Sequence, residues 1–185
     1  MAPNARAPRE RWVDAALAAL ARGGVDAVRV EVLATHIGVT KGSFYGHFAG
    51  RGELLAALLD EWERRSTNDV LAQVEAEGRS PRDRIRRVAE LTFSDDLHQI
   101  DLAVRSWARH DPAVAARLRG VDNVRMDFLR AMFGAFLEDP DEVEARSTLA
   151  FSLVIGRHFI AADHPDGPGA ASIRLAGELL LRPER

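Results

Sequence analysis

The chain has 185 residues, 46% of them apolar, and no cysteine, which excludes disulfides, thiolate catalysis and cysteine-bound zinc. Its net charge of −3 argues against a protein that binds nucleic acid over its whole surface. No apolar run approaches the roughly 20 residues that span a bilayer, and the N-terminus lacks the apolar centre of a signal peptide, so we expect a cytoplasmic protein.

Helix signals predict an all-α fold of nine helices in two modules. The expected helices cover about residues 8–22, 30–36, 40–48 and 51–77, then two that begin near residues 81 and 95, and finally 112–137, 142–163 and 170–181. Short helices followed by longer ones predict a head, residues 1–52, and a larger helical bundle, residues 53–185. The fourth helix is expected to connect them rigidly.

Residues 30–48 have the spacing of a helix-turn-helix. Ala34 is small where two helices must cross closely, Gly38 lies where the turn needs a positive φ, and Thr40 can cap the next helix. The core of the motif is expected to consist of Leu33, Ala34, Gly38, Phe44 and Phe48.

The third helix, "TKGSFYGHF", has a face suited to a DNA groove. Gly42 and Gly46 lie opposite the phenylalanines, and each costs roughly 1 kcal/mol inside a helix, so close approach to base edges is a reason for them. Tyr45 and His47 border this face and are expected to reach phosphates. The alternatives are a frayed helix end and ordinary boundary residues.

Basic side chains lie at the start of the third and fourth helices. Lys41, the only lysine of the chain, and Ser43 are expected to meet bases, and Arg51 a phosphate. Residues 1–52 carry a net charge of +3 and the remainder a net of −6, which fits a polyanion-binding head on an acidic body. A difference this small also fits chance scatter, and Lys41 alone also fits a solvated capping charge.

The segment "GVDAVRVEVLATHIGVTKGSFYGHFAGRGELLAALL" resembles the DNA-binding region of the TetR family of transcriptional regulators. The resemblance implies that Thr40, Lys41, Gly42 and Ser43 lie nearest the bases and that Tyr45, His47 and Arg51 hold phosphates. It also implies a homodimer on a double-stranded DNA operator and a C-terminal domain that binds a small effector.

Two positions depart from the pattern of that family. Where many relatives begin the second helix with threonine, this chain has Arg29, which is able to bind a phosphate but not to cap the helix. Glu31 stands where some members have a basic residue. Its carboxylate would repel phosphate or accept a hydrogen bond from cytosine N4.

The last two predicted helices are apolar on two opposite sides, as expected for helices that contact their own domain and a second subunit. One side of the eighth helix carries Leu149, Leu153 and Ile160, and one side of the ninth carries Leu175 and Leu179. The other sides are assigned to a dimer interface and comprise Phe151, Val154, Ile155, Phe159, Ile173, Ala176 and Leu180. The alternative is the centre of a monomeric bundle.

Aromatic, methionine and polar residues of the middle helices are candidates for an effector pocket, although such residues are more often plain core. The candidates are Trp62, Phe93, Arg105, Trp107, Met126, Met132, Phe133 and His158. Asp95, Asp96, His98 and Asp101 have ligand types that also suit a metal, but two of them serve as helix caps, so we expect neither a metal nor another cofactor.

The favoured interpretation is a sequence-specific DNA-binding transcriptional regulator, a repressor that a small apolar or amphipathic effector releases from its operator. Residues 1–52 would bind DNA, and residues 53–185 would bind the effector and dimerise. The alternative is a helical DNA-binding protein that is constitutive or controlled by a protein partner. No catalytic motif is present, so an enzyme is not expected.

Overall fold

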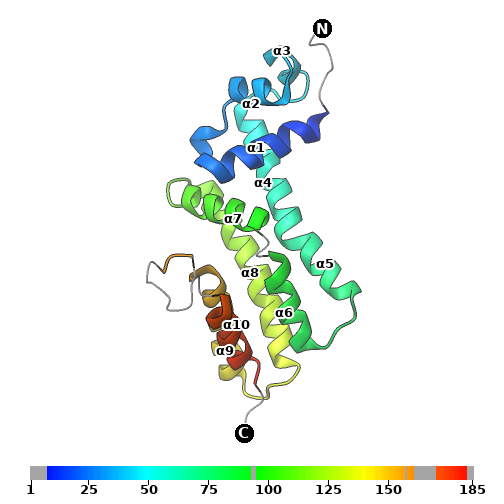
Figure 1. Ribbon diagram of the computed structural model, residues 1–185, viewed down its shortest axis with the longest axis vertical. Helices are drawn as coiled ribbons and strands as arrows, with labels where there is room; N and C mark the ends of the chain where they lie inside the picture. Colours follow the sequence, from blue (N-terminus) through cyan, green and yellow to red (C-terminus); the bar gives the residue numbers. More distant parts are fainter. Residues whose placement is uncertain (1–7, 93–94, 157, 161–169, 183–185) are drawn as a thin grey trace. The chain divides into compact units, whose positions relative to one another are not determined.

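The computed structural model describes residues 8–92, 95–156, 158–160 and 170–182, and these residues form helices and turns without a strand (Figure 1). The expected all-α class is confirmed. The chain divides into two compact units, one of Met1–Asp69 with Ser94–Val121 and one of Val70–Phe93 with Asp122–Arg185. The predicted functional boundary after residue 52 stays a prediction.

The helices follow the predicted order along the chain. They are α1 (Arg9–Gly23), α2 (Val30–Ile37), α3 (Lys41–Phe44), α4 (Arg51–Glu63), α5 (Asp69–Ala76), α6 (Pro81–Thr92), α7 (Asp95–Ala108), α8 (Pro112–Gly134), α9 (Pro140–Gly156) and α10 (Ala170–Leu180). A 3-10 turn, η1 (Val25–Ala27), precedes α2. A π-helical turn, η2 (Arg64–Asn68), joins α4 to α5, so these three elements form the long fourth helix of the prediction.

The first unit is built on the apolar stripe of α1. Trp12, Ala16 and Leu20 are fully buried on this stripe, where α1 packs against α2, α4 and α7. Helix α4 adds Leu58 and α7 adds Val104, each with no exposed surface. Burying a valine or leucine side chain such as Leu20, Leu58 or Val104 stabilises the unit by roughly 1.5–3 kcal/mol, so this core holds the head in place.

Ion pairs tie the polar side of the long helix to its neighbours in the first unit. Arg65 Nη2 lies 2.5 Å from Asp14 Oδ1 of α1, and its Nε lies 2.5 Å from Glu61. Arg117 of α8 donates to Glu63 and Asp60 at 2.7 and 2.6 Å. Within η2, Ser66 and Thr67 are buried. No proline or glycine in this stretch of the sequence indicates an irregular helical turn.

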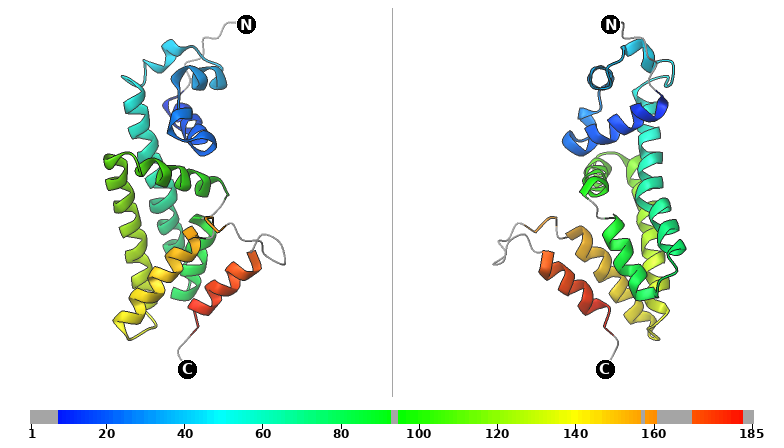
Figure 2. Two further views of the ribbon diagram at one scale, coloured as in Figure 1. Left: turned by 90° about the vertical axis from the view of Figure 1, so that its left-hand side faces the viewer. Right: turned by 45° about the vertical axis from the view of Figure 1, so that its right-hand side comes forward.

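The second unit has its own core, centred on Phe133, which is fully buried with Ile85, Leu129 and Leu181 around it. Arg82 covers the ring of Phe136 at 3.8 Å and donates to the backbone oxygen of Leu181. Figure 2 shows α9 and α10 side by side in this unit, in agreement with their mutual contacts. A guanidinium at the last carbonyls of a helix is favourable, so Arg82 fixes the end of α10.

Two helix bounds differ from the expected ones. Helix α9 begins at Pro140 because the Asp139 carboxylate accepts from the amide of Asp141 at 2.9 Å, and as described it ends at Gly156. Helix α8 ends at Gly134, after which the amides of Phe136 and Leu137 donate to the oxygen of Phe133. None of the described helices is long and apolar enough to cross a membrane.

Candidate DNA-binding interface

The turn between α2 and α3 depends on Gly38. Its φ of 78° is left-handed, and its amide donates to the oxygens of Ala34 and Thr35 at 3.0 and 3.2 Å. The amide of Val39 also donates to Ala34 at 3.0 Å. A residue with a side chain is strained at this φ, so the predicted role of Gly38 is confirmed.

Helix α3 is shorter than expected, since regular helix ends at Phe44 and residues 45–47 form a turn. The amide of His47 donates to Phe44 at 2.9 Å, and that of Phe48 donates to the same oxygen at 3.1 Å. Two glycines in this stretch lower helix propensity, which explains the early end. Thr40 occupies the N-cap position but its hydroxyl makes no capping bond; its backbone oxygen accepts from Ser43 instead, so the predicted side-chain cap is wrong.

Aromatic packing fixes α3 on the head. Phe44 and Phe48 are buried and stack at 5.3 Å, and the Trp12 ring of α1 meets Phe44 edge-on at 5.2 Å. Tyr45 packs against Phe44 at 5.3 Å while 57% of its surface stays exposed. Four residues of the predicted motif core, Leu33, Ala34, Phe44 and Phe48, are all buried.

Lys41 is exposed at the first position of α3 and pairs with Glu31 of α2. Its Nζ lies 2.5 Å from Glu31 Oε1. The hydrogen bond from Lys41 holds the pKa of the Glu31 carboxyl below its usual range, and the same bond raises the pKa of Lys41. Both groups are therefore charged at neutral pH, and they form a donor and an acceptor side by side at the exposed end of the helix.

Gly42 is exposed, and the chain itself does not require a glycine there. A Cβ at this position would meet only the Thr40 hydroxyl, at an ordinary 3.7 Å, and φ is not left-handed. Neither crowding nor strain in the folded chain therefore explains this residue, which leaves approach of another surface as a reason.

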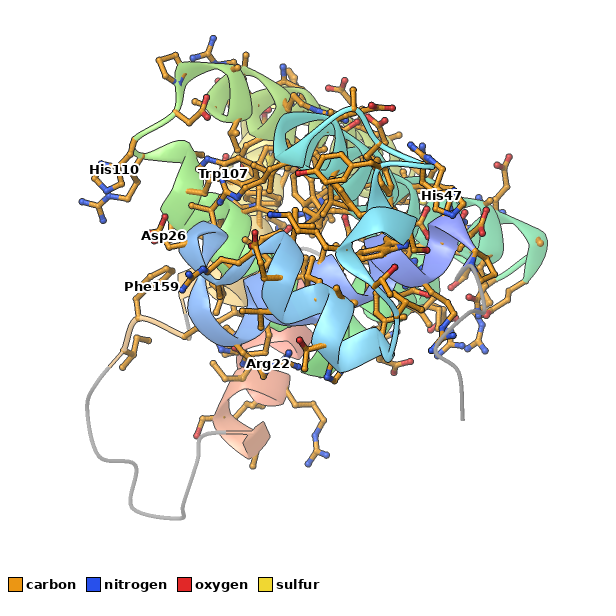
Figure 3. All side chains as sticks on the ribbon, turned by 90° about the horizontal axis from the view of Figure 1, so that it is seen from above. Arg22, Asp26, His47, Trp107, His110 and Phe159 are labelled. Atoms are coloured by element: carbon orange, nitrogen blue, oxygen red, sulfur yellow. The ribbon has the colours of Figure 1, made fainter. Side chains whose placement is uncertain are left out.

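Two other residues that were predicted to contact DNA have side-chain polar atoms buried in the head. The Ser43 hydroxyl and His47 Nε2 are buried, without a hydrogen-bond partner among the residues that the structure describes. The His47 ring packs edge-on against Phe48 at 6.5 Å, and Figure 3 shows His47 on the opposite side of the head from Asp26. Rotation of either side chain is needed before these atoms reach DNA.

Arg51 has a structural role that the sequence did not indicate. Its Nε donates to the oxygen of Val28 at 2.7 Å and its Nη2 to that of Val25 at 2.6 Å. These bonds tie the start of α4 to η1 and leave Nη1 for the predicted phosphate contact. Arg29 is exposed just before α2 and makes no side-chain cap, as expected.

Residues 13–58 match the family described as bacterial regulatory proteins, tetR family. The helix-turn-helix transcriptional regulator TtgW of Pseudomonas putida is 40% identical over 58 residues, which cover 31% of this chain and 43% of TtgW. The residues matched to the family contain α2, the turn at Gly38 and α3. Over this part of the chain the protein is similar to the tetR family of bacterial regulatory proteins.

Solved structures of transcriptional regulators share the fold along nearly the whole chain. A transcriptional regulator from Rhodococcus sp. Rha1 has a TM-score of 0.70 at 19% identity, covering 95% of this chain and 94% of that one. A regulator from Saccharomonospora viridis, in complex with choline, has a TM-score of 0.73 at 17% identity, with 94% and 93% covered. FadR from Bacillus subtilis, in complex with stearoyl-CoA, has a TM-score of 0.69 at 15% identity, with 96% and 100% covered.

The sequence matches cover about a third of the chain or less, whereas the structural matches cover nearly all of it. The chain spans less than half the length of the curated relative that it matches, and identities below 25% establish the fold alone. The family that residues 13–58 match is one of bacterial regulatory proteins.

The predicted effector residues are divided between the cores of the two units. Trp62 is buried in the first core, Trp107 packs against it, and Arg105 pairs with the buried Asp101 at 2.8 Å. In the second unit the packing includes Met126, Met132 and Phe133. His158 is exposed, and Phe93 lies outside the described residues. Grouping of these residues around one ligand stays a prediction.

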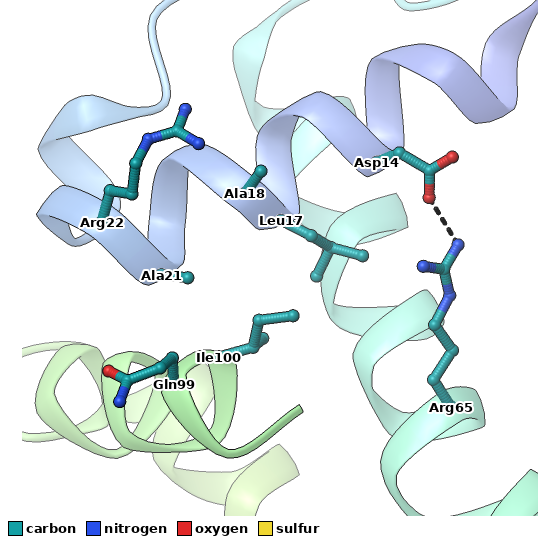
Figure 4. Close-up of a pocket in the computed structure, with 8 residues that line it drawn as sticks. All are labelled: Asp14, Leu17, Ala18, Ala21, Arg22, Arg65, Gln99 and Ile100. Carbon is teal, nitrogen blue, oxygen red and sulfur yellow. Dashed lines mark hydrogen bonds and ion pairs between the residues drawn. The ribbon is translucent and has the colours of Figure 1, made fainter. Parts of the chain in front are cut away.

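A groove of about 690 Å³ lies within the first unit, between α1 and α7 (Figure 4). Leu17, Ala18 and Ile100 are among its apolar walls, and the Asp14–Arg65 ion pair closes one end. None of the predicted effector residues lines it. Among the described residues, no group of three or more His, Asp or Glu is placed to hold a metal ion.

Helices α9 and α10 each have exposed leucines on the side opposite to the predicted dimer face. Phe151, Val154, Ile155, Ile173, Ala176 and Leu180 are half-buried within the unit, and only Phe159 of the predicted set is exposed. Leu149, Leu175 and Leu179 keep 50–56% of their surface exposed. The sequence showed both apolar sides of each helix but not which side its own unit covers.

Proposed function

We propose that this protein is a homodimeric transcriptional repressor that binds an operator through the exposed start of α3 and is released by a small effector. The observation that carries the proposal is the head itself: Phe44 and Phe48 anchor α3 while Lys41, Gly42 and Tyr45 stay exposed on one short segment. In helix-turn-helix proteins the N-terminal residues of the second helix contact base edges.

The proposed contacts follow from side-chain chemistry. Lys41 and the backbone at Gly42 would meet base edges in a groove about 12 Å wide, with Thr40 and Ser43 beside them. Tyr45, His47, Arg29 and the Nη1 of Arg51 would donate to phosphates, which position the protein without reading sequence. The basic balance of residues 1–52 supports this assignment.

A second copy of the chain is proposed to cover the apolar α9–α10 surface. Leu149, Leu175 and Leu179 are exposed there, and a twofold axis would make the same leucines meet their counterparts in the partner. Two recognition segments in one dimer would read an inverted repeat with half-sites about 34–36 Å apart.

The effector is proposed to be small and apolar or amphipathic, and to be bound by residues 53–185. Support comes from proteins of the same fold that were crystallised with choline and with stearoyl-CoA. These two ligands differ in size and charge, so the fold does not select one of them. A ligand that favours the non-binding spacing of the two heads about 100-fold would lower operator affinity by about 2.7 kcal/mol.

Selection of bound duplexes from a random-sequence pool tests the DNA-binding proposal. The purified chain is expected to enrich an inverted repeat whose half-sites lie one helical turn apart, because two identical heads contact the DNA. Enrichment of a single asymmetric site would contradict the dimer, and no enrichment at all would contradict sequence-specific binding.

A further inference from the structure

The Glu31–Lys41 pair lies where an acidic group weakens DNA binding. The two side chains are 62% and 50% exposed and lie 2.5 Å apart at the start of α3. Surface ion pairs of this exposure contribute little to folding stability. Stability is therefore a weak reason for an acidic side chain at this position, and contact with DNA is the stronger one.

The negative charge of Glu31 affects any group that Lys41 contacts. Because its carboxylate accepts a hydrogen bond from Lys41 Nζ at 2.5 Å, a phosphate or base that contacts Lys41 in this position also lies close to Glu31. Arg29 lies near Glu31, and Tyr45 lies near Lys41. On a phosphate backbone, Glu31 occupies the one lysine of the chain and adds a negative charge beside other negative charges.

The same pair matches one edge of a base pair. Cytosine presents its N4 amino donor in the major groove, directly beside the O6 and N7 acceptors of the paired guanine. A carboxylate acceptor beside an ammonium donor is the complement of that edge. The backbone of Gly42, which has no side chain, follows Lys41 directly and leaves room for close approach.

We propose that Glu31 is a specificity-determining residue, which accepts from cytosine N4 while Lys41 donates to the paired guanine, and which weakens binding to DNA without that base pair at this position. The inference rests on the proposed function, namely that α3 enters a DNA groove. It adds a base preference and a penalty on non-specific DNA, neither of which the presence of a helix-turn-helix implies.

The test compares wild type with Glu31→Gln in two measurements. In selection from a random pool, wild type is expected to enrich a C·G pair at one position of each half-site. Glu31→Gln is expected to move that preference to A·T, because glutamine pairs with adenine N6 and N7. On a scrambled duplex of equal length, Glu31→Gln is expected to bind about threefold to tenfold more tightly, since Lys41 is freed for a phosphate.

The salt dependence of DNA binding gives a second measurement of the role of Glu31. One additional phosphate contact steepens the slope of log K against log salt on the scrambled duplex by about 0.9. Asp26→Asn is the matched control, because it removes one charge from the same head at an exposed residue on the opposite side from His47 (Figure 3). Thermal unfolding of all three proteins shows whether the head stays folded.

The outcomes separate the two proposals. An unchanged base preference together with a salt slope equal to that of Asp26→Asn would overturn the role of Glu31 and leave the regulator intact. If wild type binds no duplex in either measurement, the proposed function itself fails, and the inference fails with it.

Discussion

A glycine at position 42 lowers the stability of α3 but would favour the proposed binding to DNA. Glycine is unfavourable in a helix, and nothing in the folded chain requires it, since an added Cβ would meet only Thr40 Oγ1 at 3.7 Å. A groove-facing backbone, by contrast, gains close approach from a missing side chain.

Gly42→Ala is therefore expected to leave the free energy of unfolding unchanged or to raise it by up to about 1 kcal/mol. The same change is expected to weaken operator binding about tenfold or more. Thermal unfolding and a binding titration measure the two effects. Gly120→Ala in α8 is the matched control, because an added Cβ there meets nothing within 4 Å. Equal operator affinity in the Gly42 variant would place α3 away from the groove.

Single residues also show what the sequence could and could not predict. The roles of Gly38 and Phe44 were predictable, because one supplies a left-handed turn and the other an apolar position with helical spacing. The bonds from Arg51 to Val25 and Val28 were not, because donation to backbone oxygens depends on how two distant segments meet. The same holds for the Glu31–Lys41 pair, which joins residues ten positions apart.

At the scale of the helix, the junction of α4 with η2 depends on a cluster of charges. Glu61 accepts from Arg64 at 2.7 and 2.9 Å and from Arg65 at 2.5 Å, and Arg65 reaches Asp14 of α1. The hydrogen bonds from Arg64 and then Arg65 lower the pKa of Glu61 from 4.5 to about 2, against the opposing effect of its partial burial.

A depressed carboxyl pKa stabilises the folded state above the unfolded value and loses that contribution as pH falls. Glu61→Gln is expected to lower the free energy of unfolding by about 1 kcal/mol at pH 7, after allowance for solvent screening. The difference from wild type should shrink as pH falls from about 4.5 towards 2, where the wild-type carboxylate is protonated.

Urea unfolding at pH 7, 4 and 2.5 measures this dependence, with Glu75→Gln on the exposed side of α5 as the control. A difference between Glu61→Gln and wild type that stays constant down to pH 2.5 would show that packing, not the charge of Glu61, accounts for the effect.

Element positions were predictable where local chemistry decides them. Ser80 and Asp111 act as N-caps of α6 and α8, since their side-chain oxygens accept from backbone amides of the first turn. The π turn at η2 was not predictable, because its buried Ser66 and Thr67 lie in a stretch that reads as ordinary helix. The early end of α3 follows from the glycines at positions 42 and 46. The sequence pattern had predicted a longer helix, over residues 40–48.

At the scale of the whole molecule, the sequence predicted two functional modules; by its internal contacts the structure also has two compact units, and α7 and the first part of α8 belong to the same unit as the head. Apolar periodicity identifies which helices are buried but not which partners bury them. For the same reason Trp62 and Phe133, both predicted to line one pocket, belong to different cores.

The exposed leucines of α10 provide a test of the dimer. Leu175→Gln with Leu179→Gln removes two apolar side chains from the proposed interface, and symmetry doubles the loss. At about 1 kcal/mol for each half-exposed leucine, the dimer dissociation constant should rise roughly a thousandfold. Analytical ultracentrifugation measures this change.

Val124→Gln is the control, because Val124 is exposed on α8 and not on α9 or α10. A double leucine variant that remains dimeric at the concentration where wild type is dimeric would place the interface elsewhere. A monomeric wild type would contradict the homodimer itself.

The most direct test of the central claim is a gel-shift titration of the full chain on the DNA upstream of its own gene, at two salt concentrations. Wild type is compared with Lys41→Ala/Tyr45→Ala, which truncates two exposed side chains of the proposed DNA-binding segment and leaves the buried Phe44 and Phe48 in place. We predict specific, salt-sensitive binding by wild type that the double variant loses while it remains folded. Binding of equal strength by the two proteins would contradict the claim that α3 meets the DNA.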